Sequence, residues 1–489
     1  MDAEKAHGLV VKLHKWRIAF ATLLFLVLFY LVAGYASNES KSTSEVVETS
    51  SYTLPSFSSP SSFVPSTTSL SRNVYPTVHP ARLKESTKPY AMTKHVIEGY
   101  ENTVCMDGSL PVYYYANGTG SGRNKFLFHF QGGGWCYNER ECYEAAVYNA
   151  PWPPSSTKAL PKRMSYPRED TDGMGYLNYQ KEKNPFLYNW NVVFVIYCDG
   201  GSFASDSEAN FNGQSLQFRG KRIREAVIQE VFKKHALAEA SDVVISGCSA
   251  GGLAVLMGID QIAKTIYQRN KGVNLKALVD SGFFAEYSSG LTEYDNTEPQ
   301  NVKLMKKMGA FDPINPATKS LDYAYALKYV FRMMNMKHGI NPDCIRDNLS
   351  VDGGSKCMFG ETLGKYVQTP MFVLQSKYDS WQIQHVSGQR NNKEAVNRLG
   401  SILQSSIVNI VNNSNARHGA HIDSCVHHCS TCSQSMLVWN NKESKEISER
   451  KAFEQWFEST SIRDSWRPRE LQTPILVLLD SPYPCEECC

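Results

Sequence analysis

The sequence has almost no excess of charge of either sign, with 51 basic and 48 acidic side chains among 489 residues. A net charge of +3 gives no basic footprint for DNA or RNA, so we expect no nucleic acid partner. Long hydrophobic runs are also scarce, which excludes a protein that crosses a membrane many times. Internal repeats are absent, yet hydrophobic residues make up 42% of the chain, which is enough for a globular core.

One apolar run stands out at residues 18–36, which carry no charged side chain. Its length is close to the roughly 20 residues that a spanning helix needs. Basic residues precede it at Lys5, Lys12, Lys15 and Arg17. The sequence predicts a signal anchor with residues 1–17 in the cytoplasm. A long signal peptide cleaved near Gly34 or Ala36, or a buried core helix, remains an alternative.

The rest of the chain divides by composition into a stalk, a catalytic domain and a tail. Residues 37–88 are rich in serine, threonine and proline and predict a flexible stalk, whereas 89–466 read as one catalytic domain. Residues 467–489 end in Cys-Glu-Glu-Cys-Cys and could not be placed on a fold. Asparagine sequons, which fit a secretory route, occur at Asn38, Asn117, Asn348 and Asn412.

Thirteen cysteines indicate folding in an oxidising lumen, where thiols pair as disulfides. Close spacing predicts that Cys136 bridges Cys142 and that Cys344 bridges Cys357. We also expect Cys248 to be a bridge partner rather than a second nucleophile. A zinc site built on Cys425, His428, Cys429 and Cys432 is an alternative, although it lacks a separated second ligand pair.

Short apolar bursts alternate with helical patterns after Tyr90, which is typical of a mostly parallel sheet covered by helices. Strands are predicted at 126–130, 192–197, 242–246, 277–280 and 371–375. Helices are predicted at 222–235, 253–268 and 447–457. The fold class is therefore α/β, with a single α/β-hydrolase-like catalytic domain behind the anchor and the stalk.

The strongest local motif is G-x-S-x-G, with Ser249 at its centre, between a predicted strand and a predicted helix. That context is the one a nucleophile elbow requires, because the turn lifts the serine hydroxyl clear of the sheet. The alternative is a simple tight turn. It does not explain the additional glycine at Gly252.

A serine nucleophile needs an acid and a histidine later in the chain. Asp379 follows the predicted strand at 371–375, where the carboxyl ends of parallel strands place functional loops. Candidate bases are His418, His421, His427 and His428. The glycine run at 132–134 with Trp135 follows a strand and offers backbone amides for an oxyanion hole; a flexible glycine hinge is the alternative.

Several strings occur in one order: FQGGGWCYNERECY, NWNVVFVIYCDGGSF, ISGCSAGGLAV, QSKYDSWQI and IDSCVHHC. Together with VCMDGSLPVYY they resemble the plant pectin acetylesterase family, which is related to the animal Notum carboxylesterase. The resemblance runs from about residue 96 to about residue 457. It implies an α/β-hydrolase fold and removal of O-acetyl groups from pectin in cell wall metabolism, without metal or cofactor.

By resemblance, the catalytic triad is Ser249, Asp379 and His428. The implied oxyanion donors are the amides of Gly134, Trp135 and Ala250. His427 is then expected to be a solvated or hydrogen-bonded loop residue. We expect a monomer in the secretory pathway that acts on acetylated pectin at the cell wall, or in the Golgi or plasma membrane if the anchor is kept.

Two positions depart from the family pattern. Gln131 stands where glutamate is usual, and Gly201 where alanine is usual. Neither belongs to the implied triad. Gln131 precedes the glycine run and so puts the bracing of that loop, and with it the level of activity, in question.

The sequence is also compatible with three other functions. A type II anchor with a stalk also describes a Golgi glycosyltransferase, and Asp170 with Asp172 supplies its short D-x-D metal motif. A lipid deacylase of the Notum kind would need a deep apolar pocket. An inactive hydrolase-fold adaptor is a third possibility, because a fold does not imply activity.

Overall fold

The computed structural model describes residues 91–148, 153–164, 175–287, 323–431, 447–460 and 475–485, which belong to one compact unit. The expected signal anchor at 18–36 and the expected stalk at 37–88 lie outside these residues. Among the helices of the described ranges, none is both long and apolar enough to cross a membrane.

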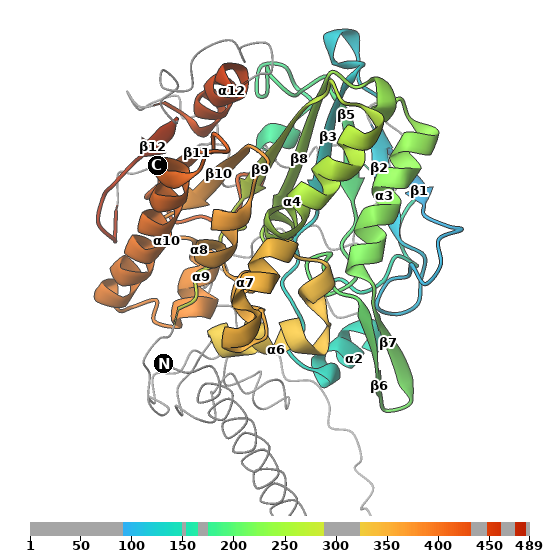
Figure 1. The fold of residues 1–489 in the computed structure, drawn as a ribbon, viewed down its shortest axis with the longest axis horizontal. Helices are drawn as coiled ribbons and strands as arrows, with labels where there is room; N and C mark the ends of the chain where they lie inside the picture. The colour runs from blue at the N-terminus through green and yellow to red at the C-terminus, as the bar shows by residue number, and fades with distance from the viewer. Residues whose placement is uncertain are drawn as a thin grey trace, which may run out of the picture. The chain divides into compact units, whose positions relative to one another are not determined.

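A ten-stranded sheet forms the centre of the described part, in the order β12-β11-β10-β9-β8-β3-β5-β2-β1-β4. In chain order these strands are β1 (Met92–Val96), β2 (Val112–Ala116), β3 (Lys125–Phe130), β4 (Arg163–Met164), β5 (Asn191–Val195), β8 (Asp242–Cys248), β9 (Asn274–Asp280), β10 (Met371–Ser376), β11 (Gly419–Asp423) and β12 (Leu476–Leu478). Neighbours from β12 to β5 run parallel, whereas β2, β1 and β4 add antiparallel pairs at one edge. The mostly parallel sheet flanked by helices is therefore confirmed (Figure 1).

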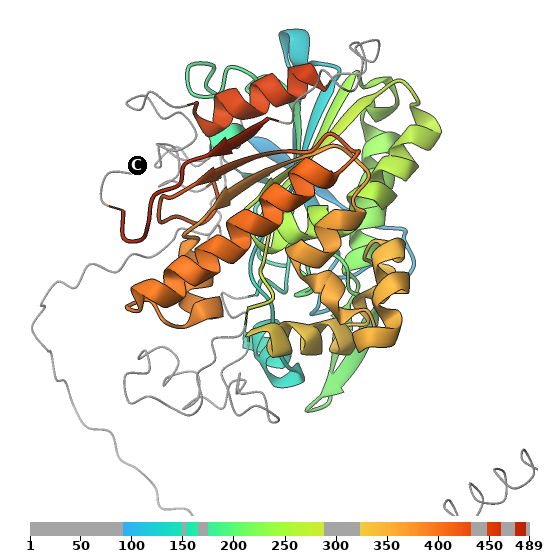
Figure 2. The ribbon, with the colours of Figure 1, turned by 60° about the vertical axis from the view of Figure 1, so that its left-hand side comes forward.

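Alternate residues of each strand point to opposite faces of the sheet, and both faces are buried. Phe126, Phe128 and Phe130 of β3 enter a core shared with α3 (Gly220–Lys234), α4 (Ala250–Arg269) and α10 (Lys393–Asn413). Leu127 enters the opposite core, which α12 (Glu449–Ser459) covers. Figure 2 shows the strands passing between α10 and α12. Burial on both faces explains why these strands read as continuous apolar bursts.

Shorter elements gather at the lower end of the molecule in Figure 1. They are α2 (Glu139–Tyr148), α6 (Tyr323–Met333), α7 (Pro342–Asp352), α8 (Gly360–Leu363), α9 (Ser380–Gln382) and the two-stranded hairpin of β6 (Ser207–Phe211) and β7 (Gln214–Phe218). Helix α9 directly follows the carboxyl end of β10. The loops that leave the parallel strands therefore meet at this end of the sheet.

The five predicted strands are all present, as β3, β5, β8, β9 and β10, and the three predicted helices are α3, α4 and α12. The sequence could not place the tail. Its described part, 475–485, forms the edge strand β12 parallel to β11 and then packs on the loop before Asp379. There the Tyr378 hydroxyl donates to the carbonyl of Ser481 at 2.8 Å, and Lys377 pairs with Asp480. The tail thus supports the segment that carries the predicted acid.

Disulfide bonds in the described chain close two short loops and also link two pairs of distant segments. The predicted bridges Cys136–Cys142 and Cys344–Cys357 are both confirmed. Cys248 is also bridged, as predicted, and its partner is Cys429. Cys105–Cys198 was not predicted, because its partners lie 93 residues apart. Close spacing in the sequence reveals short loops only, whereas bridges across the fold depend on which strands become neighbours.

Candidate active site

Ser249 lies on the turn between β8 and α4 with a left-handed backbone, at φ 58° and ψ −125°. A non-glycine residue held in this region is strained, as the serine of a nucleophile elbow is. Both flanking positions require glycine, because neighbouring backbone atoms lie too close for a Cβ atom. A Cβ atom on Gly247 would lie 2.3 Å from the carbonyl oxygen of Gly251, and one on Gly251 would lie 2.0 Å from that of Phe130.

The glycine run after β3 lies directly against this elbow. A Cβ atom on Gly132 would meet the Cys248 carbonyl oxygen at 2.4 Å and the Cβ of Ser249 at 3.0 Å. Gly134 has a φ of 65°, which favours glycine. Within the described residues, the amides of Gly134 and Trp135 donate to no protein acceptor. Together with the first amide of α4, at Ala250, they are the donors that we expect to bind an oxyanion.

The predicted acid and base meet in the fold. Nδ1 of His428 lies 2.8 Å from Oδ2 of Asp379, although the two residues are 49 positions apart. Asp379 is fully buried, and its carboxylate also accepts from the Gln382 amide at 2.9 Å and from the Gln375 side chain at 3.1 Å. The other ring nitrogen of His428, Nε2, is buried with no partner among the described residues. Nδ1 of His428 is therefore hydrogen-bonded to the predicted acid, and Nε2 is available to accept a proton.

A disulfide joins the two halves of this arrangement. Cys248 immediately precedes Ser249 and Cys429 immediately follows His428, and their Cα atoms lie 5.7 Å apart. The amide of Cys429 also donates to the Ser281 hydroxyl at 2.8 Å. The segments that carry the predicted nucleophile and base are thus joined by a covalent bond between their neighbours, although His428 Nε2 makes no hydrogen bond to the Ser249 hydroxyl.

The loop that carries Trp135 is braced by the segment after β5. The Tyr197 hydroxyl donates to the carbonyl of Gly134 at 2.9 Å and accepts from the amide of Ser202 at 2.9 Å. The Trp135 indole in turn donates to the Ser202 hydroxyl at 2.9 Å. The Gln131 side chain accepts a hydrogen bond from the Tyr197 amide at 3.1 Å. Although glutamine replaces the usual glutamate here, the side chain still acts as a hydrogen-bond acceptor. Tyr197 and Ser202 were not singled out from the sequence.

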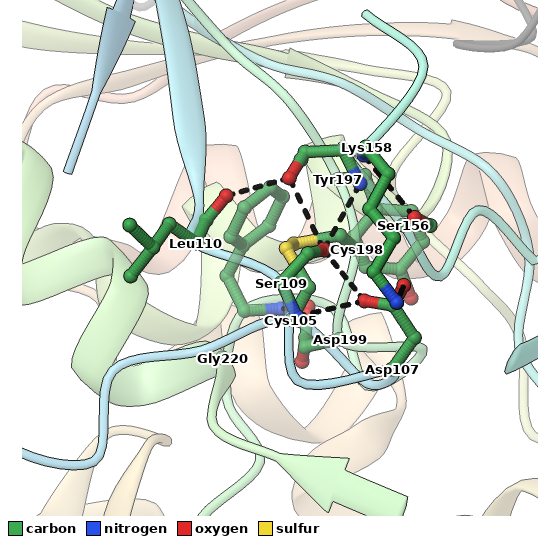
Figure 3. The surroundings of a disulfide bond; sticks show 12 residues. Cys105, Asp107, Ser109, Leu110, Ser156, Lys158, Tyr197, Cys198, Asp199 and Gly220 are labelled. Atoms are coloured by element: carbon green, nitrogen blue, oxygen red, sulfur yellow. Dashed lines mark hydrogen bonds and ion pairs between the residues drawn. A yellow bond between two sulfur atoms is a disulfide. The ribbon is translucent and has the colours of Figure 1, made fainter. Parts of the chain in front are cut away.

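The bracing segment is itself anchored by Cys105–Cys198, shown in Figure 3. Next to Cys198, the buried carboxylate of Asp199 accepts from the amide of Phe203 and the hydroxyl of Ser205, at 3.2 and 2.6 Å. Burial raises the pKa of Asp199 to about 6 despite these hydrogen bonds. A Cβ atom on Gly220 would lie 2.0 Å from this carboxylate, so only glycine fits there.

Asp280, at the end of β9, connects the elbow to the loop that carries His428. Its backbone carbonyl accepts from the amide of Ser249 at 2.9 Å. Its carboxylate accepts from the amides of Ser430 and Thr431 at 2.9 and 3.1 Å. The sequence identified Asp280 only as the end of a strand. Asp280 supports both segments because β8, β9 and the loop that carries His428 are neighbours in the fold, which the sequence does not show.

His427 is buried beside the predicted base and points away from it. Its Nε2 lies 3.1 Å from both carboxylate oxygens of Asp423, and the residue is 4% exposed. Burial opposes a charge on this ring, but the carboxylate of Asp423 outweighs it and raises the pKa of His427 to about 9. Of the two alternatives expected from the sequence, solvated or hydrogen-bonded, the structure shows the second.

Folding stability is expected to fall as the pH rises from about 6 to about 9. The raised pKa of His427 means that its ion pair contributes fully below the unfolded value of about 6.5 and is lost as the pH passes about 9. Burial likewise raises the pKa of the neighbouring Glu449 from about 4.5 to about 8, so its contribution to stability is lost between about pH 4.5 and pH 8 and adds to the decline above pH 6. Thermal unfolding midpoints at pH 6, 7.5 and 9 measure this, and His427→Gln should flatten the decline. Stability that increases with pH would contradict it.

The remaining candidates have other partners. Nδ1 of His418 accepts from the Met371 amide and Nε2 lies 3.2 Å from the Val367 carbonyl, which makes His418 a buried structural residue. His421 lies 3.1 Å from the carbonyl of Ile447 through Nε2. Cys425 and Cys429 are both disulfide-bonded, so their sulfurs are not zinc-binding thiolates. The D-x-D motif at 170–172 lies outside the described residues.

Known proteins resemble this chain in both sequence and fold. Pectin acetylesterase 5 of Arabidopsis thaliana is 30% identical over 406 residues, covering 79% of this chain and 81% of its own length. The human palmitoleoyl-protein carboxylesterase NOTUM is 26% identical over 333 residues, covering 67% and 58%. The solved structure of the Wnt deacylase Notum from Drosophila, 19% identical, matches with a TM-score of 0.59 over 80% of this chain and 96% of that one.

The Notum structure agrees with the α/β-hydrolase-like fold, and the two relatives named above are esterases. A family model described as Pectinacetylesterase matches residues 85–298 and 295–489, which include the elbow, the acid and both adjacent histidines. This match spans most of the chain. The chain therefore belongs to the pectinacetylesterase family of carboxylic ester hydrolases.

Proposed function

We propose that this protein is a serine carboxylesterase that removes O-acetyl groups from pectin, an acetylated galacturonan, in cell wall metabolism. The observation that carries the proposal is the buried Asp379–His428 hydrogen bond, joined through Cys248–Cys429 to a serine on a strained elbow. Family membership supports an acetylated polysaccharide as substrate.

Acylation begins when the hydroxyl of Ser249 attacks the acetyl carbonyl and His428 Nε2 takes its proton. Asp379 accepts the Nδ1 hydrogen, which fixes the tautomer and steadies the positive charge that forms on the ring. The two additional hydrogen bonds to Asp379, from Gln375 and the Gln382 amide, hold the carboxylate in this orientation. Under this proposal each ring nitrogen of His428 has a separate task.

The negative charge on the carbonyl oxygen is met by the amides of Gly134, Trp135 and Ala250. Because the Gly134 carbonyl is tied to Tyr197 and the Trp135 indole to Ser202, these amides keep their direction during the reaction. His428 then gives its proton to the departing sugar oxygen. Water, activated by the same histidine, attacks the acetyl-serine and releases acetate.

The chain acts in the secretory pathway or at the cell wall under this proposal, as a monomer. Its disulfides fit an oxidising compartment. Of the three sequons in the described residues, those at Asn117 and Asn412 are exposed and open to glycosylation, whereas Asn348 is half-buried. Retention of residues 18–36 as an anchor is part of the proposal. Release of full-length protein from membranes by alkaline carbonate, or a mature N-terminus near residue 37, would disprove that part.

Acetate release from acetylated homogalacturonan tests the proposed function. We expect the purified protein to release acetate, and methyl-esterified galacturonan without acetyl groups to yield neither acetate nor methanol. A fluorophosphonate probe should label the same preparation at Ser249, located by peptide mapping. Labelling at another residue, or acetate release that survives complete labelling, would contradict the assigned mechanism.

A further inference from the structure

Four aromatic side chains form a continuous wall beside the candidate site. They are Trp135, Phe284, Tyr323 and Trp381, and we call them the aromatic wall. They come from four separate segments: the glycine loop, the loop after β9, the start of α6, and α9. The centre of the Trp381 ring lies 5.8 Å from that of Trp135, 5.5 Å from that of Phe284 and 5.7 Å from that of Tyr323. Trp381 therefore contacts every other member.

Trp381 also faces the predicted base. Its ring centre lies 6.1 Å from that of His428, and the two planes are inclined by only 28°. Trp381 follows Asp379 by two residues, so the acid and this ring leave β10 together. The Trp381 ring also contacts Trp135, which carries one of the expected oxyanion amides. The Trp381 ring thus spans the distance between the base and the oxyanion loop.

The other members of the wall are firmly held. Phe284 is fully buried, whereas Trp135 and Tyr323 are each 5% exposed. Trp135 and Phe284 pack edge to face with centres 5.0 Å apart, and the Trp135 indole is hydrogen-bonded to Ser202. Such packed interiors have no spare volume to accept extra methylene groups without displacing a ring. Trp381 is the only partly buried member; the His385 ring also packs on it, with ring centres 4.7 Å apart.

An ester carbonyl bound at this site has two substituents to place. When the carbonyl carbon meets Ser249 and its oxygen meets the amides, the sugar oxygen must lie near His428 to receive a proton. The remaining substituent, the acyl chain, must leave the same carbon on another side, and Trp381 is the partly buried ring that lies between the base and the oxyanion loop. A methyl group needs little room there, whereas a longer chain meets the indole of Trp381.

We propose that Trp381 sets the length of the acyl group, so that the enzyme accepts acetyl esters and rejects long-chain ones. This inference rests on the proposed function and makes it more specific. Trp381 acts as a specificity determinant, because its ring occupies the place that additional methylene groups would take. Fixed rings on its far side prevent it from moving aside.

The test is a chain-length series of p-nitrophenyl acetate, butyrate and octanoate. For the unmodified enzyme we expect kcat/KM to fall at least tenfold from acetate to octanoate, since a few methylene groups discriminate by that order. In Trp381→Ala the octanoate-to-acetate ratio should increase roughly tenfold or more. Trp381→Phe should give an intermediate ratio. The profile of the unmodified enzyme provides a test even if a variant fails to fold.

Trp190→Ala is the matched control. Trp190 is 3% exposed and packs against Phe186 and Phe457 in the core on the other face of the sheet. This variant loses the same side chain and should leave the chain-length ratio unchanged. An unmodified enzyme that cleaves octanoate as well as acetate, or an unchanged ratio in Trp381→Ala, would overturn the inference alone. Absence of hydrolysis of every ester would overturn the proposed function as well.

Discussion

Replacing Ser249 by alanine is expected to lower kcat/KM for p-nitrophenyl acetate by roughly 10⁴ or more, with the fold retained. Loss of the nucleophile leaves only the oxyanion amides and binding, which act on water attack alone. Alanine keeps the Cβ atom that serine already places at this positive φ, and the hydrogen bond from the Ser249 amide to the Asp280 carbonyl does not involve the hydroxyl. Steady-state kinetics with a thermal unfolding curve for the same preparation measure both parts of the expectation.

Ser246→Ala provides the control for this experiment. Ser246 lies three residues earlier on β8, is fully buried, and donates to the carbonyl of Phe128 at 2.8 Å. Its removal also deletes a buried hydroxyl from the same strand, so stability should decrease while kcat changes little. If Ser249→Ala kept a tenth of the original activity, or if both variants lost activity equally, Ser249 would not be the nucleophile.

The second large effect is expected at His428, and not at its neighbour. His428→Ala should cost activity nearly as heavily as Ser249→Ala, and the double variant should be little worse than either, because triad members act as a unit. His427→Ala should keep kcat within about an order of magnitude, since its ring binds Asp423 and turns away from Asp379. Initial rates of the three variants, measured well below their unfolding midpoints, separate the two histidines.

Stability should show the opposite order. His427→Ala leaves the carboxylate of Asp423 buried without its counter-charge, and breaking a buried pair in this way costs about 3–5 kcal/mol. After removal of His428, the carboxylate of Asp379 would keep its hydrogen bonds from the Gln375 side chain and the Gln382 amide, so this change should cost less stability. A His427→Ala enzyme that is fully stable but inactive would reverse the assignment of the base. Full activity in both variants would remove the triad altogether.

Much of the fold could be predicted because its central strands are buried on both faces. Strands β3, β5, β8, β9 and β10 read as unbroken apolar bursts and were located close to their observed bounds. The antiparallel edge was missed, because β1 and β4 are short and mixed in polarity. The β6–β7 hairpin was missed as well, although Asn212 and Gly213 form a recognisable turn signal between its strands.

Within the candidate site, the residues that follow strands were predictable and their supports were not. Ser249 and Asp379 directly follow β8 and β10, where a pattern of strand and loop is visible in the sequence. Composition could not separate His427 from His428, and only the family resemblance favoured one of them. Asp280, Tyr197 and Ser202 act through hydrogen bonds between segments far apart in the chain. Such contacts depend on the order of strands in the sheet, which no local pattern encodes.

The Cys248–Cys429 bond has a consequence for when the enzyme becomes active. Its two cysteines are 181 residues apart, so the bond closes only after β8 and the late loop have come together. Cytosolic thiols keep such pairs reduced, whereas the secretory lumen oxidises them. Under the proposed secretory route, the segments that carry Ser249 and His428 would stay unlinked in a newly made chain until it enters an oxidising compartment. Oxidation would then act as a maturation step, delaying esterase activity until the protein is on its way to its substrate.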